Sequence, residues 1–428
     1  MDEQTRPNRR AGEAPLPPHF RHNFTALVVD YVSFGVASAF VNPSTVLSAF
    51  ARTLTASQPL IGLVGTTISA GWLLPQLGSA AALGGKPRKK PYMLRMLYVG
   101  RPLWFLLALA TGAGLTRYPA AMLALLLLCV GLFFLTDGIA SVAWFDILAR
   151  AIPLSRRGRL IGVAQLCGGL LSTGVGALVG LILSSPRVPY PTSYALLFAL
   201  SGLLLIPSTV ALALLREPAG SAAEPSRTLR DWTKQMGGVW RGDASFRRMV
   251  LYRWLIGLMD LAIPFYILHA TEVIHLPKVI TGWFVSAQVL GGVAASMGLA
   301  WLSDRWGPRP VIRMGALTSL LAPLLALAIH MGLWPQAYPL VYFFIGISNS
   351  SWMLGPLNYM LERAPEGKRP LYVGLYNTMG GLLVAAPFLG GVLLRATSYP
   401  VLFAVAAAGV TAGLALSLRL QDPHAEIR

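Results

Sequence analysis

Apolar runs of about 18 or more residues recur from one end of this chain to the other, and each is long enough to cross a bilayer as a helix. Charged residues make up 12% of the 428 residues and apolar ones 55%, with a mean hydropathy of +0.59. A soluble domain carries about 25% charged residues. Such a chain cannot cover a water-exposed surface, and the sequence predicts an all-α membrane protein. A β-barrel is disfavoured, because its strands would alternate apolar and polar residues.

The runs predict twelve transmembrane helices, with spans near residues 24–49, 58–82, 93–113, 119–148, 160–183, 193–215, 247–270, 278–302, 311–331, 337–361, 371–394 and 399–418. The longest break divides them into six and six. The expected domains are a disordered cytosolic tail at 1–22, an N-terminal six-helix bundle at 23–216, a cytosolic central loop at 217–245, a C-terminal six-helix bundle at 246–420 and a cytosolic tail at 421–428.

Basic residues gather in alternate breaks between the spans. One side of the membrane collects the two tails, the central loop and clusters such as Lys86 to Lys90, whereas the other side holds only Arg52, Arg117, Arg187, Lys278 and Arg395. The positive-inside rule therefore predicts that both termini are cytoplasmic, in a multi-pass protein of the plasma or inner membrane. The net charge of +18 follows from this topology and does not indicate nucleic-acid binding. Residues 231–240 are expected to form an amphipathic helix against anionic lipid.

An internal repeat relates the two halves. Pro153, Gly162, Gly168 and Gly169 recur at one offset of 212 residues as Pro365, Gly374, Gly380 and Gly381. Because six spans is an even number, both copies enter the membrane in the same direction. The two bundles are therefore expected to be related by a pseudo-twofold axis along the membrane normal.

The break after the eighth span, AWLSDRWGPR from Ala300 to Arg309, resembles the signature loop G-x-L-a-D-R-x-G-R-[RK] of the major facilitator superfamily. Ala300 replaces the first glycine of that pattern, and Pro308 replaces the first of its two final basic residues. The resemblance implies two pseudo-symmetric six-helix bundles, a monomer, and a secondary transporter that works by alternating access. No Gly-Pro pair of the kind associated with drug/proton antiporters stands in the fifth span.

Ionisable residues inside spans are costly in lipid and usually face the protein interior. Asp30, Arg101, Asp137 and Asp260 are such residues. Burial disfavours the charged form of a carboxylate, so Asp30 and Asp137 are expected to line a central cavity and bind a proton or a cationic solute in competition. The alternative is structural: Arg101 neutralises one of the two acids as a fixed pair, and Arg253 and Asp260 have structural partners.

Polar and aromatic residues at similar depth complete the predicted cavity. They are Tyr31, Phe34, Trp144, Gln165, Gln288, Asn349, Trp352, Tyr376 and Asn377. Hydrogen bonds between helices are an equally good explanation of an isolated polar residue in a span.

Charged and polar residues at the cytoplasmic helix ends form a predicted gate, which the superfamily resemblance implies. They are Asp146, Arg150, Asp304, Arg305, Arg309, Asn358 and Glu362. The alternative is that these residues set topology and surface charge alone, since exposed ion pairs contribute about 0–1 kcal/mol.

No pattern indicates an enzyme, a cofactor or a metal site: the six histidines lack ligand spacing, and no phosphate-binding glycine loop occurs. The sequence favours a proton-coupled carrier of a small organic solute, leaning to export of amphipathic or cationic compounds. Uptake of a neutral solute such as a sugar, transport of a lipid-like substrate, and a non-transporting membrane receptor or scaffold are the alternatives.

Overall fold

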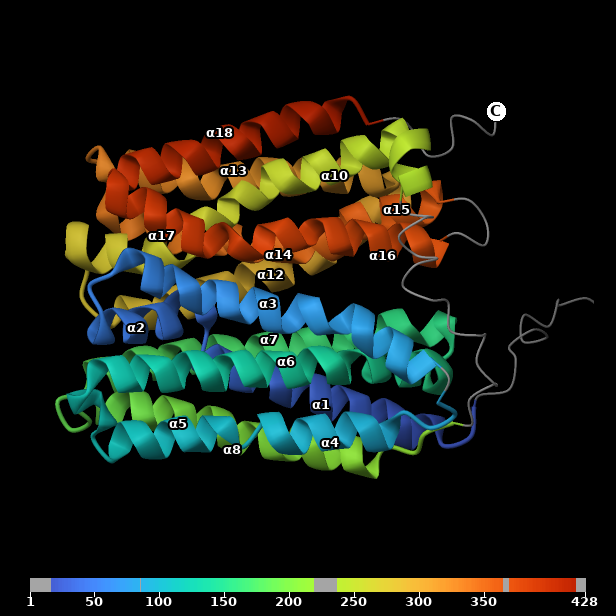
Figure 1. The fold of residues 1–428 in the computed structure, drawn as a ribbon, viewed down its shortest axis with the longest axis horizontal. Coiled ribbons are helices and arrows are strands. Elements are labelled where there is room, and N and C mark those ends of the chain that lie inside the picture. Colours follow the sequence, from blue (N-terminus) through green and yellow to red (C-terminus); the bar gives the residue numbers. More distant parts are fainter. Residues whose placement is uncertain (1–16, 85, 219–236, 365–368, 421–428) are drawn as a thin grey trace, which may run out of the picture.

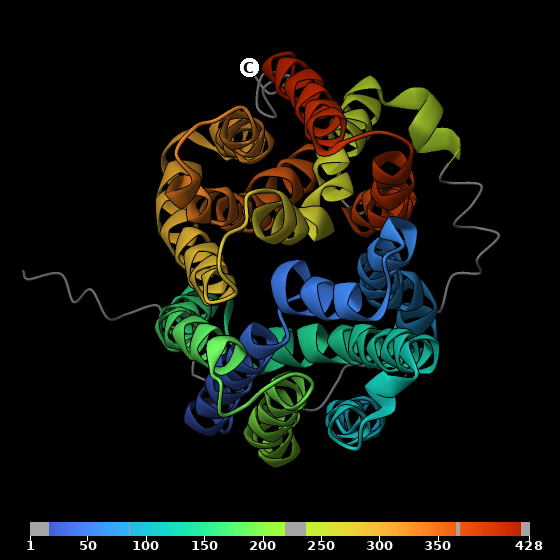
Figure 2. The ribbon, with the colours of Figure 1, turned by 90° about the vertical axis from the view of Figure 1, so that its left-hand side faces the viewer.

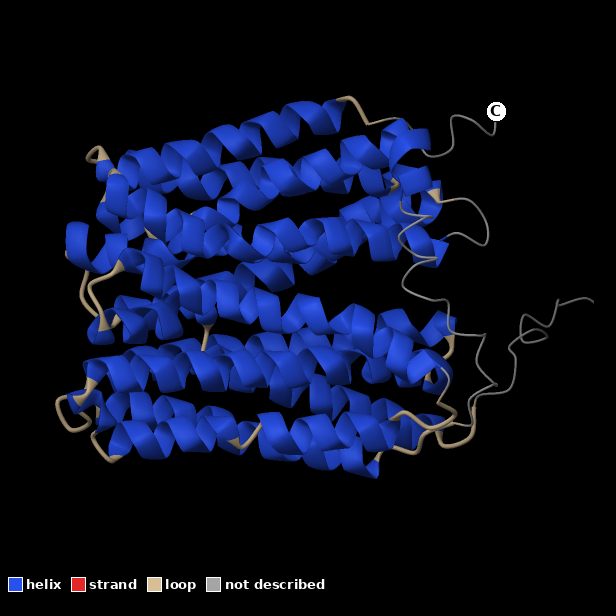
Figure 3. Cartoon of the chain, in the orientation of Figure 1, coloured by secondary structure: helices blue, strands red, loops and turns tan. Residues whose placement is uncertain are grey.

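The computed structural model describes residues 17–84, 86–218, 237–364 and 369–420, and within these ranges it contains helices and loops but no strand (Figure 3). Eleven helical segments of the described chain are long and apolar enough to cross a membrane. α3, Gln58–Gly84, is a further helix of 27 residues that runs alongside them and completes the predicted set of twelve (Figure 1). The prediction of an all-α membrane protein is confirmed.

The first half contains six spans. They are formed by α1 (Phe20–Phe40) continued by η1 (Pro43–Leu47) and α2 (Ser48–Leu54); α3; α4 (Lys90–Gly100) with α5 (Leu103–Gly112); α6 (Pro119–Ala151); α7 (Leu154–Ser184); and α8 (Thr192–Leu214).

The second half repeats this pattern. Its spans are α10 (Ala244–Gly257) continued by η3 (Leu258–Leu261), η4 (Ile263–Phe265), α11 (Tyr266–Leu268) and η5 (His269–Val273); α12 (Ile280–Trp306); α13 (Pro308–His330); α14 (Pro339–Trp352) with η7 (Met353–Leu357) and α15 (Asn358–Arg363); α16 (Arg369–Gly380) with η8 (Gly381–Ala385) and α17 (Ala386–Ala396); and α18 (Tyr399–Leu418).

Several spans are interrupted where the sequence predicted continuous helices. Pro102 separates α4 from α5, because proline has no N–H to donate and crowds the preceding turn. In the seventh span, the helix tightens to a 3-10 turn at Leu258–Leu261. Arg253 and Asp260 therefore do not lie on one regular α-helix. Non-helical backbone at membrane depth is tolerated where it lines a cavity or is buried in protein.

The two halves meet along two pairs of helices. α3 packs on α17, and α7 packs on α12, with the blue-to-green half and the yellow-to-red half on opposite sides of the junction (Figure 2). In the repeated order of spans, α3 is second and α12 is second in its own half, while Gly168 and Gly380 relate α7 to the α16–η8 junction. One contact is thus the pseudo-symmetric copy of the other.

α1 begins and α18 ends at the same end of the bundle, which we call the terminal face (Figure 1). α1 begins at Phe20, earlier than the predicted boundary at residue 23. The amide of Asn23 exchanges two hydrogen bonds of 2.9 Å with the backbone of Arg216, which holds the first turn against the end of α8. Most of the central loop and of the amphipathic helix expected at 231–240 lies outside the described residues, as do residues 1–16 and 421–428 of the two tails.

The interface is tightest near the face opposite the terminal face. A Cβ on Gly282 of α12 would lie 2.2 Å from the Gly176 carbonyl oxygen of α7. A Cβ on Gly62 of α3 would lie 2.1 Å from the carbonyl oxygen of Pro387. Backbones approach this closely only where small residues allow it, so glycine is required at both positions.

Candidate functional site

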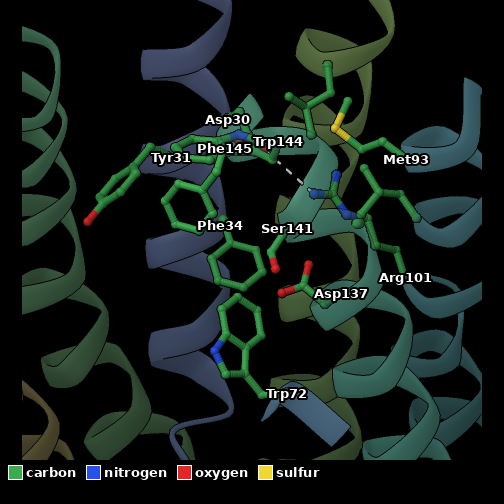
Figure 4. A pocket seen from close by; sticks show the side chains of 13 residues that line it. Asp30, Tyr31, Phe34, Trp72, Met93, Arg101, Asp137, Ser141, Trp144 and Phe145 are labelled. Atoms are coloured by element: carbon green, nitrogen blue, oxygen red, sulfur yellow. Dashed lines mark hydrogen bonds and ion pairs between the residues drawn. The ribbon is translucent and has the colours of Figure 1, made fainter. Parts of the chain in front are cut away.

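A small cavity of about 160 Å³ lies within the first half, and we call it the acid chamber (Figure 4). Asp30, on α1, and Asp137, on α6, both line it, with Arg101 from the break between α4 and α5. Its walls are otherwise largely aromatic, formed by Tyr31, Phe34, Trp72, Trp144 and Phe145. The acids that the sequence singled out therefore face one space, together with the arginine between them.

Asp30 is held by three neighbours. The indole Nε1 of Trp144 donates a 2.8 Å hydrogen bond to its Oδ2, and the hydroxyl of Ser208 donates to its Oδ1. Arg101 approaches that same Oδ1 with Nη2 at 3.6 Å. Asp30 is only 5% exposed, so a buried carboxylate here depends on these partners.

Arg101 is in turn fixed from the opposite side. Its Nη1 donates to the Thr209 hydroxyl at 2.6 Å and to the Leu205 carbonyl at 3.2 Å. The guanidinium is therefore committed to Asp30 and α8, and it makes no ion pair with Asp137 within 4.0 Å. Of the two pairings that the sequence left open for Arg101, the structure places it with Asp30.

Asp137 differs from Asp30 in having no hydrogen bond or ion pair to any residue in the described part of the chain. One turn further along α6, the Ser141 hydroxyl donates back to the Gly138 carbonyl at 2.8 Å and does not engage it. Figure 4 shows the Asp137 carboxylate and Ser141 facing the open space of the chamber. The chamber thus contains two carboxylates and one guanidinium, and only one carboxylate is paired.

A larger cavity of about 630 Å³ lies between the halves, and we call it the central cavity. α3 contributes one wall, and the second half contributes the rest, including Arg253, Asp260 and Asn349. Serines are frequent in the lining of the central cavity: Ser69 on α3, and Ser319, Ser348 and Ser351 in the second half. This lining offers hydrogen-bonding groups, whereas that of the acid chamber is mainly aromatic.

Arg253 lies over the ring of Tyr376 at 4.6 Å from its centroid and donates to the Tyr376 carbonyl at 3.3 Å and to Asn377 Oδ1 at 3.4 Å. It forms no ion pair with Asp260 within 4.0 Å in the described chain. The predicted residues Asp260, Asn349 and Tyr376 all line the central cavity. Asn377 does not line this cavity itself, but it accepts a hydrogen bond from Arg253, which does.

Trp72 of α3 lines both cavities. Its indole closes the end of the acid chamber that Asp137 and Ser141 face (Figure 4). The sequence predicted one cavity for the acids Asp30, Asp137 and Asp260, but the structure divides them between two, with Trp72 lining both.

Hydrogen bonds between the halves occur at the face opposite the terminal face. Gln288 Oε1 accepts from Asn42 Nδ2 and from the Ser44 hydroxyl, both at 3.0 Å. Arg52 and Glu272 form an ion pair close to solvent. Gln288 was predicted to line the solute cavity, but the structure uses it to join α12 to the end of the first span, and it lines neither cavity.

At the terminal face, Asp146 and Arg150 are paired within the first half. Asp146 bonds Arg150 and Lys89, the latter at 2.9 Å, and Arg150 bonds Glu217 at 3.0 Å. Glu217 also accepts from the backbone N–H groups of Lys89 and Lys90. This cluster fastens the end of α6 to the residue that follows α8.

The remaining predicted residues are more dispersed. Asp304 is exposed near the end of α12, and the Arg305 guanidinium stacks over Trp301 and Trp306. Arg309 and Glu362 each have interactions, and Asn358 begins α15. Gln165 is half-buried on α7 and lines neither cavity. The side chain of Trp352 lies outside the described set.

Sequence reasoning missed a buried cluster in the second half. His269, fully buried, contacts the Tyr338 hydroxyl through Nδ1 at 2.9 Å and His330 through Nε2 at 3.0 Å. It also missed Glu217, Glu272 and Trp72. Of these residues, only Glu272 could have been found, through its partner Arg52, which the sequence marked as one of the few basic residues on its side of the membrane. The described residues contain no group of three or more metal-ligating side chains.

Comparison with known families agrees with this architecture. The sequence profile of the Major Facilitator Superfamily matches residues 27–386 and 249–428. The chain belongs to this superfamily. It is also 25% identical, over 81% of its length, to uncharacterized proteins of Mycobacterium tuberculosis (Rv2209) and Mycobacterium bovis (Mb2232), covering 69% of each. These matches identify a superfamily of transporters but not a substrate.

Solved structures with a similar fold include a mutant of the nucleoside transporter NupG. Its TM-score is 0.66 at 13% identity, over 94% of this chain and 100% of that one. A bacterial homologue of the lysosomal transporter Spinster gives 0.62 at 12% identity, over 95% of each chain. A bacterial homologue of ferroportin, in an inward-facing state, gives 0.64 at 15% identity, over 95% of this chain and 99% of that one. At these identities the likeness concerns the fold.

Proposed function

We propose that this transporter couples proton movement to the export of a small amphipathic or cationic organic solute. The observation that carries the proposal is the carboxylate of Asp137, which faces a cavity inside the membrane without a hydrogen-bonding or ionic partner in the described chain. An ionised acid inside the membrane without a structural partner is energetically costly. Binding of a proton or a cation would account for its presence.

Asp30 has the complementary role of holding Arg101. Its three partners stabilise the ionised form, so its charge and that of Arg101 cancel within the chamber. Asp137 then remains as the group that changes its charge during transport. The central cavity, with about 630 Å³ and a polar wall, is the proposed place for the body of the solute.

Rocking of the two halves about this cavity would give alternating access. The contacts of Gln288 and Glu272 hold the halves together opposite the terminal face, which suits a state sealed on that side. The distribution of basic residues supports placing the terminal face in the cytoplasm of a plasma or inner membrane. Functioning as a monomer, without a cofactor, is part of the same proposal, and so is a gate at the terminal face that includes Asp304 and Arg309.

A second candidate is uptake of a neutral solute such as a sugar. The serines of the central cavity and Asn349 favour it, because they offer hydrogen-bond donors and acceptors to hydroxyl groups. In that case Asp137 would bind only the proton and would have no direct role in binding the solute.

Proteoliposomes with a trapped pH dye would separate these candidates. An imposed proton gradient is combined with a panel of lipophilic cations, sugars and amino acids, using the parent protein, Asp137→Asn and Met331→Leu, the last a control on an exposed side chain. Proton flux driven by lipophilic cations, lost only in Asp137→Asn, is the expected result. Flux driven by a sugar would favour the second candidate, and flux unchanged in Asp137→Asn would overturn the role of this acid.

A further inference from the structure

The acid chamber is a site distinct in character from the central cavity. Five aromatic side chains line it, and its only carboxylate without a bonding partner in the described chain belongs to Asp137. Taking Asp30 and Arg101 as a neutral pair, the ionised chamber has one uncompensated negative charge. Aromatic faces add to this, since the negative face of a ring attracts a cation within about 6 Å. The chamber is therefore electrostatically suited to a monovalent cation.

The volume limits what can enter. A dry cavity of about 150 Å³ holds a molecule of the size of benzene, and the acid chamber has about 160 Å³. A compact head group fits, but a whole drug-sized solute does not. The rest of such a molecule would have to lie in the central cavity, which shares Trp72 with the acid chamber.

Hydrogen-bonding capacity narrows the class of cation. The Asp30 oxygens already accept hydrogen bonds from Trp144 and Ser208 and form an ion pair with Arg101, so Asp137 is the main free acceptor. A guanidinium or primary ammonium brings several N–H donors, more than this one carboxylate can satisfy, and a donor left without a partner on burial is costly. A quaternary ammonium has no donor to satisfy and is recognised by charge and aromatic faces alone.

We propose that the acid chamber binds the quaternary ammonium head group of the solute, between the Asp137 carboxylate and the rings of Phe34 and Trp72, with Trp72 as the boundary past which the attached chain extends into the central cavity. This inference rests on the proposed function for its biological meaning, but the binding site itself is tested independently of transport.

Protons should compete with this ligand. The titratable and charged groups that line the chamber with Asp137 are Asp30 and Tyr31 of α1 and Arg101 after α4. α3 and α8 contribute Trp72 and Leu212, which do not titrate. Protonation of Asp137 removes the uncompensated charge, so affinity for the ammonium should fall as the pH is lowered.

The test is calorimetric binding of choline to the purified full chain, compared with 3,3-dimethylbutan-1-ol, its neutral isostere. Choline is expected to bind at least about tenfold more tightly than the isostere, because the neutral isostere cannot make the cation–π and ionic contacts. Asp137→Asn should remove that preference, and Asp137→Glu should keep it, which controls for misfolding. Asp260→Asn makes the same charge change in the central cavity and so reports which cavity holds the ion.

Trp72 is tested by Trp72→Phe, which keeps an aromatic face, and Trp72→Leu, which does not. Trp283→Leu is the matched control on an indole that is 64% exposed. Loss of the choline preference in Trp72→Leu alone supports the site. Equal affinity for choline and its isostere, or loss of choline binding in Asp260→Asn but not in Asp137→Asn, overturns it. Choline binding without proton-coupled transport would leave the site standing and reject the proposed function, whereas transport without choline binding would do the reverse.

Discussion

Arg52 and Glu272, 220 residues apart in the chain, form an ion pair with 2.5 Å between Nε and Oε1 that joins the two halves of the transporter. Both side chains are about one-third exposed, and exposed pairs of this kind contribute about 0.2–1 kcal/mol. Glu272→Gln should therefore shift the balance between the closed and open states of this face by no more than about fivefold.

Spin labels placed on exposed sites of the two halves, read by pulsed electron resonance, would measure that shift in population. The swap Arg52→Glu with Glu272→Arg is the matched control and should return the distribution to that of the parent. A Glu272→Gln distribution shifted far more than fivefold would mean that this pair dominates closure of the face.

The glycine contact between α7 and α12 should matter more. In Gly282→Ala, the added Cβ meets the backbone of Gly176 and Gly180 at 2.2–2.8 Å, and backbone cannot move aside as a side chain can. The helices must separate, and the protein should favour the state open at the face opposite the terminal face. Thiol labelling of a cysteine placed at Ser44 should rise severalfold. Gly174→Ala, on the partner helix α7, has open space around it, and labelling in this variant should match the parent.

Asp30→Asn and Asp137→Asn should differ in stability. Asn at position 30 leaves Arg101 buried without its counter-charge, and breaking a buried pair costs about 3–5 kcal/mol. Asn at position 137 removes no bond of the described structure and should leave the unfolding transition of the purified protein nearly unchanged. Thermal or denaturant unfolding of both variants provides the measurement, and equal destabilisation would mean that Asp137 also has a structural partner.

The buried histidine cluster should contribute to stability. His269→Leu removes the bonds to Tyr338 and His330, while the Tyr338 hydroxyl keeps its bond to the Tyr266 carbonyl. Each lost hydrogen bond contributes about 0.5–1.5 kcal/mol. A lower unfolding temperature is expected, with a smaller decrease in His330→Leu, because His330 is only half-buried. An unchanged transition in His269→Leu would show that the cluster adds nothing to the stability of the second half.

The sequence predicted the helical fold well, because crossing lipid requires long apolar runs and the repeat in glycine positions survives in the chain. It also singled out Asp30, Arg101 and Asp137, since charges in apolar runs are conspicuous. It did not predict that Arg101 would pair with Asp30 in particular, because the break at Pro102 and the positions of Ser208 and Thr209 decide that choice.

Contacts between the halves were harder to predict. Gln288 looked like a cavity residue because its depth in the span was evident, but its partners Asn42 and Ser44 lie about 245 residues away in the chain. Trp72 had no ionisable neighbour in sequence to draw attention to it. Its position between two cavities depends on the packing of three helices and not on any local pattern.

The close glycine contacts at Gly282 and Gly62 have a consequence for the conditions under which the transporter can work. Backbone packed on backbone contains no net charge for dissolved ions to screen, whereas an exposed ion pair weakens as the Debye length shortens to about 8 Å at physiological ionic strength. The part of the seal that rests on such contact should therefore stay closed across wide changes in the ionic strength on that side of the membrane.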